Sequence, residues 1–146
     1  MSASVTHAHP VGKDGAAIQT RAVSLAVKLD PKEAFPYKTF MDTLIDFSRT
    51  PEIEEKMLRV QKLINAQSPP SFAAEQLGQT VAVHESMPFA LFSFLRHPKS
   101  FEDCLFCATL NGGDRDTLGA MACAISGAYL GVESIPQSWR EKLENR

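Results

Sequence analysis

The chain has 146 residues, with 15 Lys and Arg against 17 Asp and Glu, which gives a formal net charge of −2 at pH 7. Hydrophobic residues make up 44% of the sequence and charged residues 22%, a composition typical of a folded globular domain. The near-neutral charge excludes the basic surface with which nucleic-acid-binding proteins attract phosphates, so we expect no direct nucleic-acid binding.

Membrane and secretion signals are not found in the sequence. The longest apolar run, Leu118 to Val132, is shorter than the ~20 residues that cross a bilayer. The segment Met1 to His7 has neither the basic nor the apolar region of a secretory signal. Three cysteines without such a signal predict free thiols in a reducing compartment. We therefore expect an intracellular protein without a membrane span, cytoplasmic by default, with nucleus or mitochondrion open if the source is eukaryotic.

Helical spacing of apolar residues fills the first half of the chain. It predicts a helix over Ala16–Lys28, begun by Asp14-Gly15 and ended by Asp30-Pro31. A second helix is predicted from Phe40 to Phe47. A third begins at Thr50-Pro51, where Thr is an N-cap and Pro occupies the first helical position. The segment between the first two helices, residues 30 to 39, is the candidate hinge.

The second half begins with a short predicted helix, Phe72 to Leu77. Residues 78 to 87 are compatible with either helix or loop. From Pro88 to Leu95 the chain is apolar on every side, which predicts a helix at the centre of the core. His97-Pro98 ends this helix.

Two further helices complete the pattern. Ser100 resembles a capping residue for the helix that ends at Leu110. A helix rich in Gly and Ala is predicted from Asp114 to Leu130, with Gly131 as its C-cap, and Ile135–Trp139 opens a last short helix. With no sustained alternation of period two, the sequence predicts an all-α fold.

The sharpest chemical motif is the run Gly112 to Thr117, in which two carboxylates and a hydroxyl follow a glycine turn and precede a helix. Carboxylate and hydroxyl oxygens are the ligands of hard cations such as Mg²⁺. Equally, Asp114 or Asp116 could cap the helix and stabilise its positive end. A calcium EF-hand is excluded, because the twelfth loop position is Ile125 rather than a bidentate Glu.

Other motifs carry weaker signals. Cys104-x-x-Cys107 has no second pair to complete a zinc site, so we expect both thiols to pack inside a helix interface. His7 and His9 could face one side of an extended segment or lie exposed in a tail. The adjacent residues His84, Glu85 and Ser86 do not make a catalytic triad, because neighbours on a helix do not face each other.

Read together, these motifs resemble the ADP-ribosylglycohydrolases, also called ADP-ribosylhydrolases. The resemblance rests on Thr6–Pro10 followed by Asp14–Ala16, on His84–Leu91, and on the long run from Gly112 through Gly131 to Trp139. It leaves out a variable insertion at about residues 32–71. It implies an all-helical orthogonal bundle with two Mg²⁺ ions, of which residues 1–146 form a part.

The resemblance also implies roles for individual residues. Asp114, Asp116 and Thr117 correspond to metal ligands. His7 corresponds to a histidine that contacts ADP-ribose, and Val81 to a position that lines the ligand. No catalytic acid–base residue is assigned, because the family carries that carboxylate in an N-terminal half.

Two departures from the family pattern bear on activity. The N-terminal half of the family, with its own acidic metal motif and phosphate-binding loop, is not matched, and we expect this chain to correspond to the C-terminal half of a larger all-helical domain. Arg115 also stands where the family usually has a small polar residue. A guanidinium near two Mg²⁺ ions costs Coulomb energy unless it turns outward.

The resemblance predicts hydrolysis of the glycosidic bond between ADP-ribose and an acceptor, with Mg²⁺ as cofactor. The acceptor is open among serine, arginine, O-acetyl-ADP-ribose and polymer. The chain alone is expected to be incomplete, and a separate N-terminal half is a candidate partner. The alternative is a truncated or inactive protein that binds ADP-ribose or mediates assembly.

Overall fold

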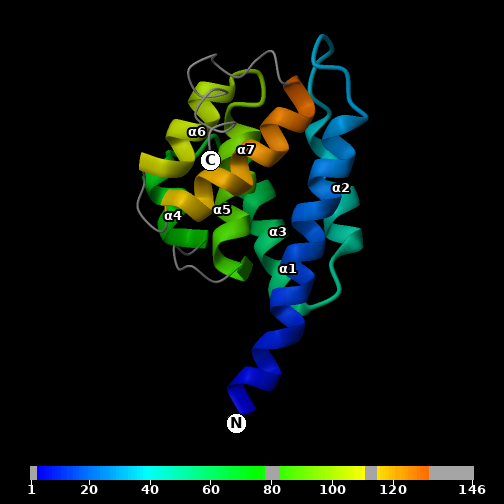
Figure 1. Ribbon diagram of the computed structural model, residues 1–146, viewed down its shortest axis with the longest axis vertical. Helices are drawn as coiled ribbons and strands as arrows, with labels where there is room; N and C mark the ends of the chain where they lie inside the picture. Colours follow the sequence, from blue (N-terminus) through cyan, green and yellow to red (C-terminus); the bar gives the residue numbers. More distant parts are fainter. Residues whose placement is uncertain (1–2, 78–82, 111–114, 132–146) are drawn as a thin grey trace, which may run out of the picture.

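The computed structural model describes residues 3–77, 83–110 and 115–131, except for the side chains of residues 3–9, 83–85 and 115 (Figure 1). Within these ranges every regular element is a helix. They are α1 (Ala3–Val27), α2 (Tyr37–Phe47), α3 (Pro51–Asn65), α4 (Pro70–Leu77), α5 (Val83–Arg96), α6 (Phe101–Leu110) and α7 (Arg115–Leu130). The all-α prediction is confirmed. The segment Ile135–Trp139, with its predicted last helix, lies outside the described residues.

Helix α1 differs from the sequence prediction at its N-terminal end. It begins at Ala3 rather than near Ala16, and it runs through Pro10 and through the expected start at Asp14-Gly15. A proline inside a helix removes one backbone hydrogen bond, which sequence rules treat as a break. Gly15 is buried in this helix, and the Asp14 carboxylate is directed to another helix, so neither residue acts as a local start signal.

Helix α3 has the predicted start. The Thr50 hydroxyl accepts a hydrogen bond from the backbone N–H of Ile53 at 3.3 Å, and Pro51 is the first helical residue. The helix ends with the N–H of Ser68 donating to the carbonyl of Leu63 at 3.0 Å, around a left-handed residue, Gln67, with φ 53°. This Schellman arrangement satisfies carbonyls at the helix end.

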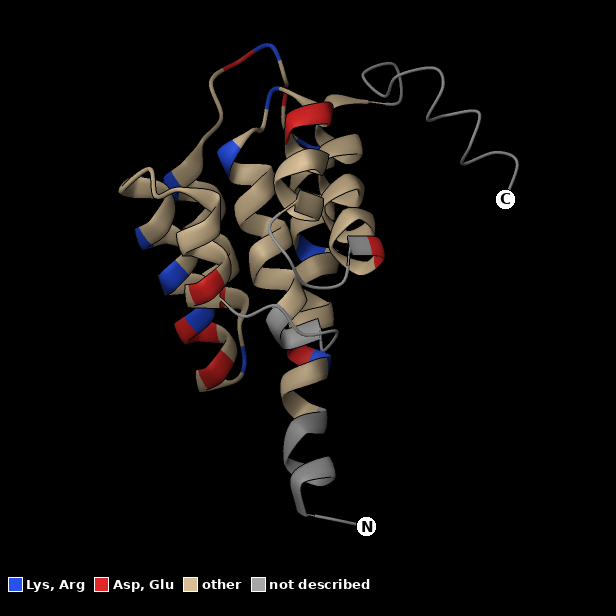
Figure 2. Cartoon of the chain, turned by 90° about the vertical axis from the view of Figure 1, so that its left-hand side faces the viewer, with Lys and Arg blue, Asp and Glu red and all other residues tan. Residues whose placement is uncertain are grey.

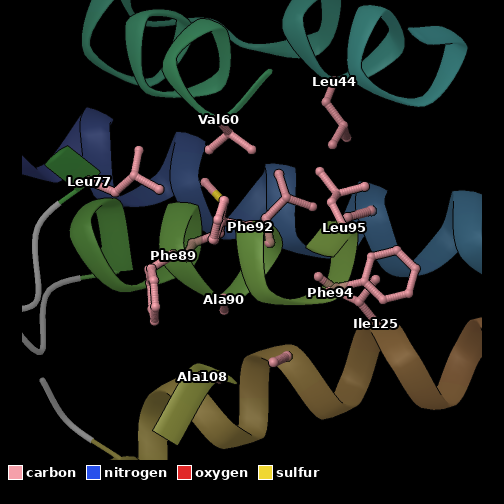
Figure 3. Close-up of a cluster of buried hydrophobic side chains, with 14 of the residues drawn as sticks. Leu44, Val60, Leu77, Phe89, Ala90, Phe92, Phe94, Leu95, Ala108 and Ile125 are labelled. Atoms are coloured by element: carbon pink, nitrogen blue, oxygen red, sulfur yellow. The ribbon is translucent and has the colours of Figure 1, made fainter. Parts of the chain in front are cut away.

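Helix α5 lies at the centre of the bundle and packs against α1, α3, α4, α6 and α7. It begins five residues before Pro88, so the proline lies inside the helix and does not open it. The predicted core segment is confirmed: Phe89, Phe92 and Phe94 are fully buried. Figure 3 shows these rings between α3 on one side and α7 on the other. Charged residues gather instead on outer helices such as α3 (Figure 2).

The segment between α1 and α2 is fastened to the bundle, which does not favour a hinge there. The Phe35 ring is buried and makes edge-to-face contacts with Phe94 and Tyr129, at centroid distances of 5.4 and 5.3 Å. The Lys99 ammonium donates hydrogen bonds to the carbonyls of Pro31 and Glu33 and, at 2.7 Å, to the Tyr129 hydroxyl. These contacts come from parts of the chain that are distant in sequence.

Helices α6 and α7 pack closely across a glycine. A Cβ added at Gly119 would lie 3.2 Å from Thr109 Cγ2 and 3.3 Å from Leu105 Cδ1, tighter than ordinary van der Waals contact. The predicted caps are confirmed at both ends of this pair. Ser100 Oγ accepts from the N–H of Asp103 at 3.2 Å, and Gly131 ends α7 with φ 89°. Nowhere in the described ranges is a helix both long and apolar enough to cross a membrane.

Candidate functional site

The candidate metal motif lies at the N-terminal end of α7. Asp116 and Thr117 belong to the first turn of this helix, and Asp114 lies outside the described residues. The Asp116 side chain is exposed, and Thr117 is half-buried and engaged in an interaction. A carboxylate here favours the positive helix end, and it is also accessible to a cation. The described geometry is therefore compatible with both roles that the sequence left open, metal ligand and helix cap.

The other two predicted ligand residues, His7 and Val81, belong to other parts of the chain. His7 lies in the first part of α1, where the backbone is described but the side chain is not. Val81, just before α5, lies outside the described residues. Helices α1, α3, α5 and α7 run in the same general direction, upward in Figure 1 and obliquely for α7. In that view α3 and α5 begin at the lower end of the bundle, α1 begins below it, and α7 begins on the left flank (Figure 1).

Each helix N-terminus carries partial positive charge from its unpaired N–H groups. Acidic side chains offset that charge at two of these ends, Glu52 and Glu54 at the start of α3 and Asp116 at the start of α7. The α1–α7 pair is held in register by a hydrogen bond from Gln19 Nε2 to the carbonyl of Met121 at 3.0 Å. The sequence could not show this alignment, because it depends on packing between segments about one hundred residues apart.

Asp14 is a buried carboxylate on α1, and its predicted role as a helix start is wrong. Its Oδ2 accepts hydrogen bonds from the N–H of Arg49 at 2.9 Å, the N–H of Thr50 at 2.8 Å and the Thr50 hydroxyl at 2.8 Å. Asp14 is only 4% exposed, and its Oδ1 is buried without a hydrogen-bond partner. The residue therefore fixes α1 to the start of α3. In the sequence, Asp14 could be recognised only as an acidic residue of the type that caps helices, which does not reveal its partners.

The oxygen donors at the start of α7 would supply part of a magnesium site. Among the residues whose placement is described, no three His, Cys, Asp or Glu side chains are grouped as metal ligands. Asp116 offers an exposed carboxylate and Thr117 a hydroxyl, which are oxygen donors suited to a hard cation. Two octahedral ions need about twelve donor positions, so most ligands would have to come from water, substrate or other protein segments.

The cysteines are structural, as predicted. Cys104 and Cys107 are buried on α6, and Cys104 Sγ lies 3.8 Å from the carbonyl of Ala122. Burial raises the pKa of both thiols, and it raises the pKa of Cys123 to about 11. A thiol with a raised pKa is a poor nucleophile and a poor metal ligand at neutral pH.

Comparison with known proteins agrees with the motifs. A family model described as ADP-ribosylglycohydrolase matches residues 1–146. The chain is 31% identical over 169 residues to "ADP-ribosylhydrolase ARH3" of Homo sapiens, covering 99% of this chain and 47% of that protein. It is 30% identical over 174 residues to the protein of the same name from Gallus gallus, covering 99% of this chain and 46% of the relative.

A shorter match reaches a bacterial protein. The chain is 44% identical over 45 residues to "ADP-ribosyl-[dinitrogen reductase] glycohydrolase" of Rhodospirillum rubrum, covering 31% of this chain and 15% of that protein. The chain thus spans about half the length of the ARH3 relatives that it matches. Since the family model matches the chain over residues 1–146, the chain belongs to the ADP-ribosylglycohydrolase family.

Proposed function

We propose that this chain forms part of the active site of an ADP-ribosylhydrolase, which hydrolyses the glycosidic bond between ADP-ribose and an acceptor. The observation that carries the proposal is the Gly112–Thr117 motif, with Asp116 exposed at the start of α7 in a chain that belongs to this family. The names of the ARH3 relatives support the same reaction class. The acceptor stays open among serine, arginine, O-acetyl-ADP-ribose and polymer.

In this proposal Asp114, Asp116 and Thr117 hold Mg²⁺ through oxygen atoms. The bound ions would orient the ribose hydroxyls and polarise the reacting centre. His7 and Val81 contact the ADP-ribose. In this proposal the ligand extends from the first part of α1, which carries His7, to the start of α7, which carries Asp116.

The remaining metal ligands and the acid–base carboxylate come from a second protein segment. Three oxygen donors cannot fill two octahedral coordination shells. The outer face of α7 offers a place for such a segment, because Asp116, Ala120 and Ala124 are exposed one turn apart. Small side chains let a neighbouring helix approach closely. We therefore expect the chain alone to have no enzymatic turnover.

The second candidate function is binding without catalysis. Among the residues that the structure describes, no three His, Cys, Asp or Glu side chains are grouped as metal ligands, and this favours a protein that binds ADP-ribose weakly or only mediates assembly. The two functions differ in what a complementing segment does. An incomplete enzyme gains turnover when the missing ligands are supplied, whereas a binding protein gains at most affinity.

The test is release of ADP-ribose from a serine-linked and an arginine-linked substrate in the presence of Mg²⁺. Three samples are assayed: the chain alone, the chain with the half of human ARH3 that it does not match, and the Asp116→Ala variant of the chain with that same half. Turnover that needs both parts and is lost in Asp116→Ala supports the proposal. Asp46→Ala, an exposed carboxylate on α2, is the matched control and should stay active. Full turnover by the chain alone would contradict the ligand count, and full turnover with Asp116→Ala would contradict the metal role.

A further inference from the structure

Residues 28–36 connect α1 to α2 at the upper end of the bundle in Figure 1, and we call this segment the strap. Its middle residues, Lys32, Glu33 and Ala34, are exposed. The backbone turns at Asp30, whose carbonyl accepts from the N–H of Glu33 at 3.1 Å and whose Oδ1 accepts from the N–H of Lys32 at 2.9 Å. These local hydrogen bonds shape the turn but do not attach it to the other helices.

One aromatic ring of the strap enters the core. Phe35 is 7% exposed, and its ring centroid lies 5.1 Å from that of Phe40, 5.4 Å from that of Phe94 and 5.3 Å from that of Tyr129. These three rings, from α2, α5 and α7, form the Phe35 socket. Edge-to-face and tilted rings at such distances attract each other, so the socket fixes where the strap lies when it is closed.

A single cation closes the strap over this socket. In the part of the chain that the structure describes, the hydrogen bonds that reach the strap's backbone from beyond α1 and α2 come from Lys99, which donates to the carbonyls of Pro31 and Glu33. Lys99 Nζ also donates to the Tyr129 hydroxyl at 2.7 Å and lies 5.1 Å from the centroid of that ring. The three acceptors match the three N–H donors of an ammonium group. Because the donor is charged, these bonds are stronger than bonds between neutral groups.

The backbone that carries Lys99 is itself held in place. Lys99 lies in the short turn between α5 and α6. The N–H of His97 donates to the carbonyl of Ser93 at 3.2 Å, the N–H of Ser100 donates to the carbonyl of His97 at 3.3 Å, and Pro98 is buried. Hydrogen bonds to both flanking helices make this turn the fixed side of the contact, and the exposed strap is the side that can move.

We propose that Lys99 is a charge-dependent latch of the strap. When the charge of Lys99 is removed, residues 28–36 leave the Phe35 socket as a unit, while the described helices keep their packing. Helix α1 does not need the strap for its position, because hydrogen bonds of Gln19 and Asp14 hold it to α7 and to the residues just before α3. The strap thus opens through a contact that is separate from those that hold the bundle together.

The strap lies far from the proposed active site. Its socket contains Tyr129, near the C-terminal end of α7, and Asp116 comes thirteen positions earlier in that helix, or about 20 Å at 1.5 Å per residue. An open strap uncovers the rings of Phe94 and Tyr129 that Phe35 contacts in the closed one. The latch is therefore a conformational device beyond ADP-ribose hydrolysis, and its test needs neither ADP-ribose nor a metal ion.

The experiment is limited proteolysis of the full chain by a glutamate-specific endoproteinase, with cleavage of the Glu33–Ala34 bond followed by mass spectrometry. The carbonyl of that bond is one of the acceptors of Lys99, so the bond is cut only when the strap is open. When opening and closing are fast, the cleavage rate follows the open fraction, and we expect Lys99→Met to be cut roughly tenfold faster than the wild type. Lys99→Arg keeps the charge and should stay within about threefold of the wild type.

Two controls separate an open strap from an unfolded chain. Lys62→Met removes an exposed cation from the last turn of α3 and should leave the cleavage rate after Glu33 unchanged. Lys99→Met should keep the helical circular dichroism of the wild type, since Lys99 is an exposed residue and its loss leaves no cavity in the core. An unchanged rate in Lys99→Met, or an equal rise in Lys62→Met, would overturn the proposal. So would loss of the helical signal in Lys99→Met, or cleavage after Glu55 inside α3 as fast as after Glu33, because the whole chain would then be unfolding.

Discussion

Replacing Asp14 by Ala should destabilise the fold strongly, because one buried carboxylate oxygen holds α1 to the start of α3. Oδ2 accepts three hydrogen bonds of 2.8 to 2.9 Å, from the N–H groups of Arg49 and Thr50 and from the Thr50 hydroxyl. Hydrogen bonds to a charged group contribute about 1.5–3 kcal/mol each. The variant would also remove the buried Oδ1, which has no hydrogen-bond partner. We therefore expect the free energy of unfolding to fall by less than that sum, by about 3 kcal/mol.

The assay is unfolding at pH 7, by urea and separately by heat, followed by far-ultraviolet circular dichroism. For a chain of this size, a loss of about 3 kcal/mol lowers Tm by roughly 6–12 °C. Asp14→Asn keeps an acceptor oxygen for the same donors and loses only the charge, so it should cost about half as much. Asp46→Ala, an exposed carboxylate on α2, is the control and should change stability by less than about 0.5 kcal/mol.

Two outcomes would refute this reasoning. If Asp14→Ala costs less than about 1 kcal/mol, the three hydrogen bonds do not hold the two helices together. If Asp14→Asn costs as much as Asp14→Ala, the acceptor oxygen contributes nothing beyond its charge. Either result would show that Asp14 does not fasten α1 to α3 through these hydrogen bonds.

Three single residues, Gln67, Gly119 and Cys123, give further predictions. Gln67→Gly should raise the free energy of unfolding by about 0.5–1 kcal/mol in a urea titration, because it relieves the left-handed backbone at φ 53°. Gly119→Val should lower it by about 1–3 kcal/mol, since the added methyls meet Thr109 and Leu105, and Gly119→Ala should have a smaller effect. The Cys123 pKa is raised from 9.0 to about 11, so iodoacetamide at pH 8 should alkylate this thiol in the folded chain roughly a hundredfold more slowly than in the unfolded chain. Stability should also fall between pH 9 and 11, because the unfolded thiol loses its proton first.

Local chemistry in the sequence predicted several elements well. Thr50-Pro51 marked the start of α3, Ser100 the start of α6 and Gly131 the end of α7, because each cap depends on residues a few positions apart. The apolar run from Phe89 to Leu95 identified the central helix for a similar reason, since a helix without a polar face must be buried.

Packing between distant segments could not be predicted in this way. Asp14 has the chemistry of an N-cap, but its carboxylate binds the backbone N–H groups of Arg49 and Thr50, just before α3, while α1 continues past it. The segment between α1 and α2 has loop composition, yet Phe35 and Lys99 fasten it to the bundle. Pro88 suggested the start of a helix and Asp14-Gly15 another, and the structure places both inside longer helices.

The sequence predicted only the local part of the candidate site. The motif at the start of α7 is local, and the structure places Asp116 there as an exposed carboxylate. Asp114 and Val81 lie outside the described residues, so their metal and ligand roles stay predictions. The common direction of α1, α3, α5 and α7 depends on tertiary packing between segments far apart in sequence.

The metal role of the α7 start can be measured directly with Mn²⁺, which binds the same oxygen donors as Mg²⁺ and broadens nearby NMR resonances. We predict that low Mn²⁺ concentrations broaden the amide resonances of residues 114–117 in the ¹⁵N-labelled chain before others, and that Asp116→Asn suppresses this effect. The acidic first turn of α3, with Glu52 and Glu54, serves as an internal control for non-specific attraction. Broadening that begins at that turn, or that persists unchanged in Asp116→Asn, would contradict the metal role.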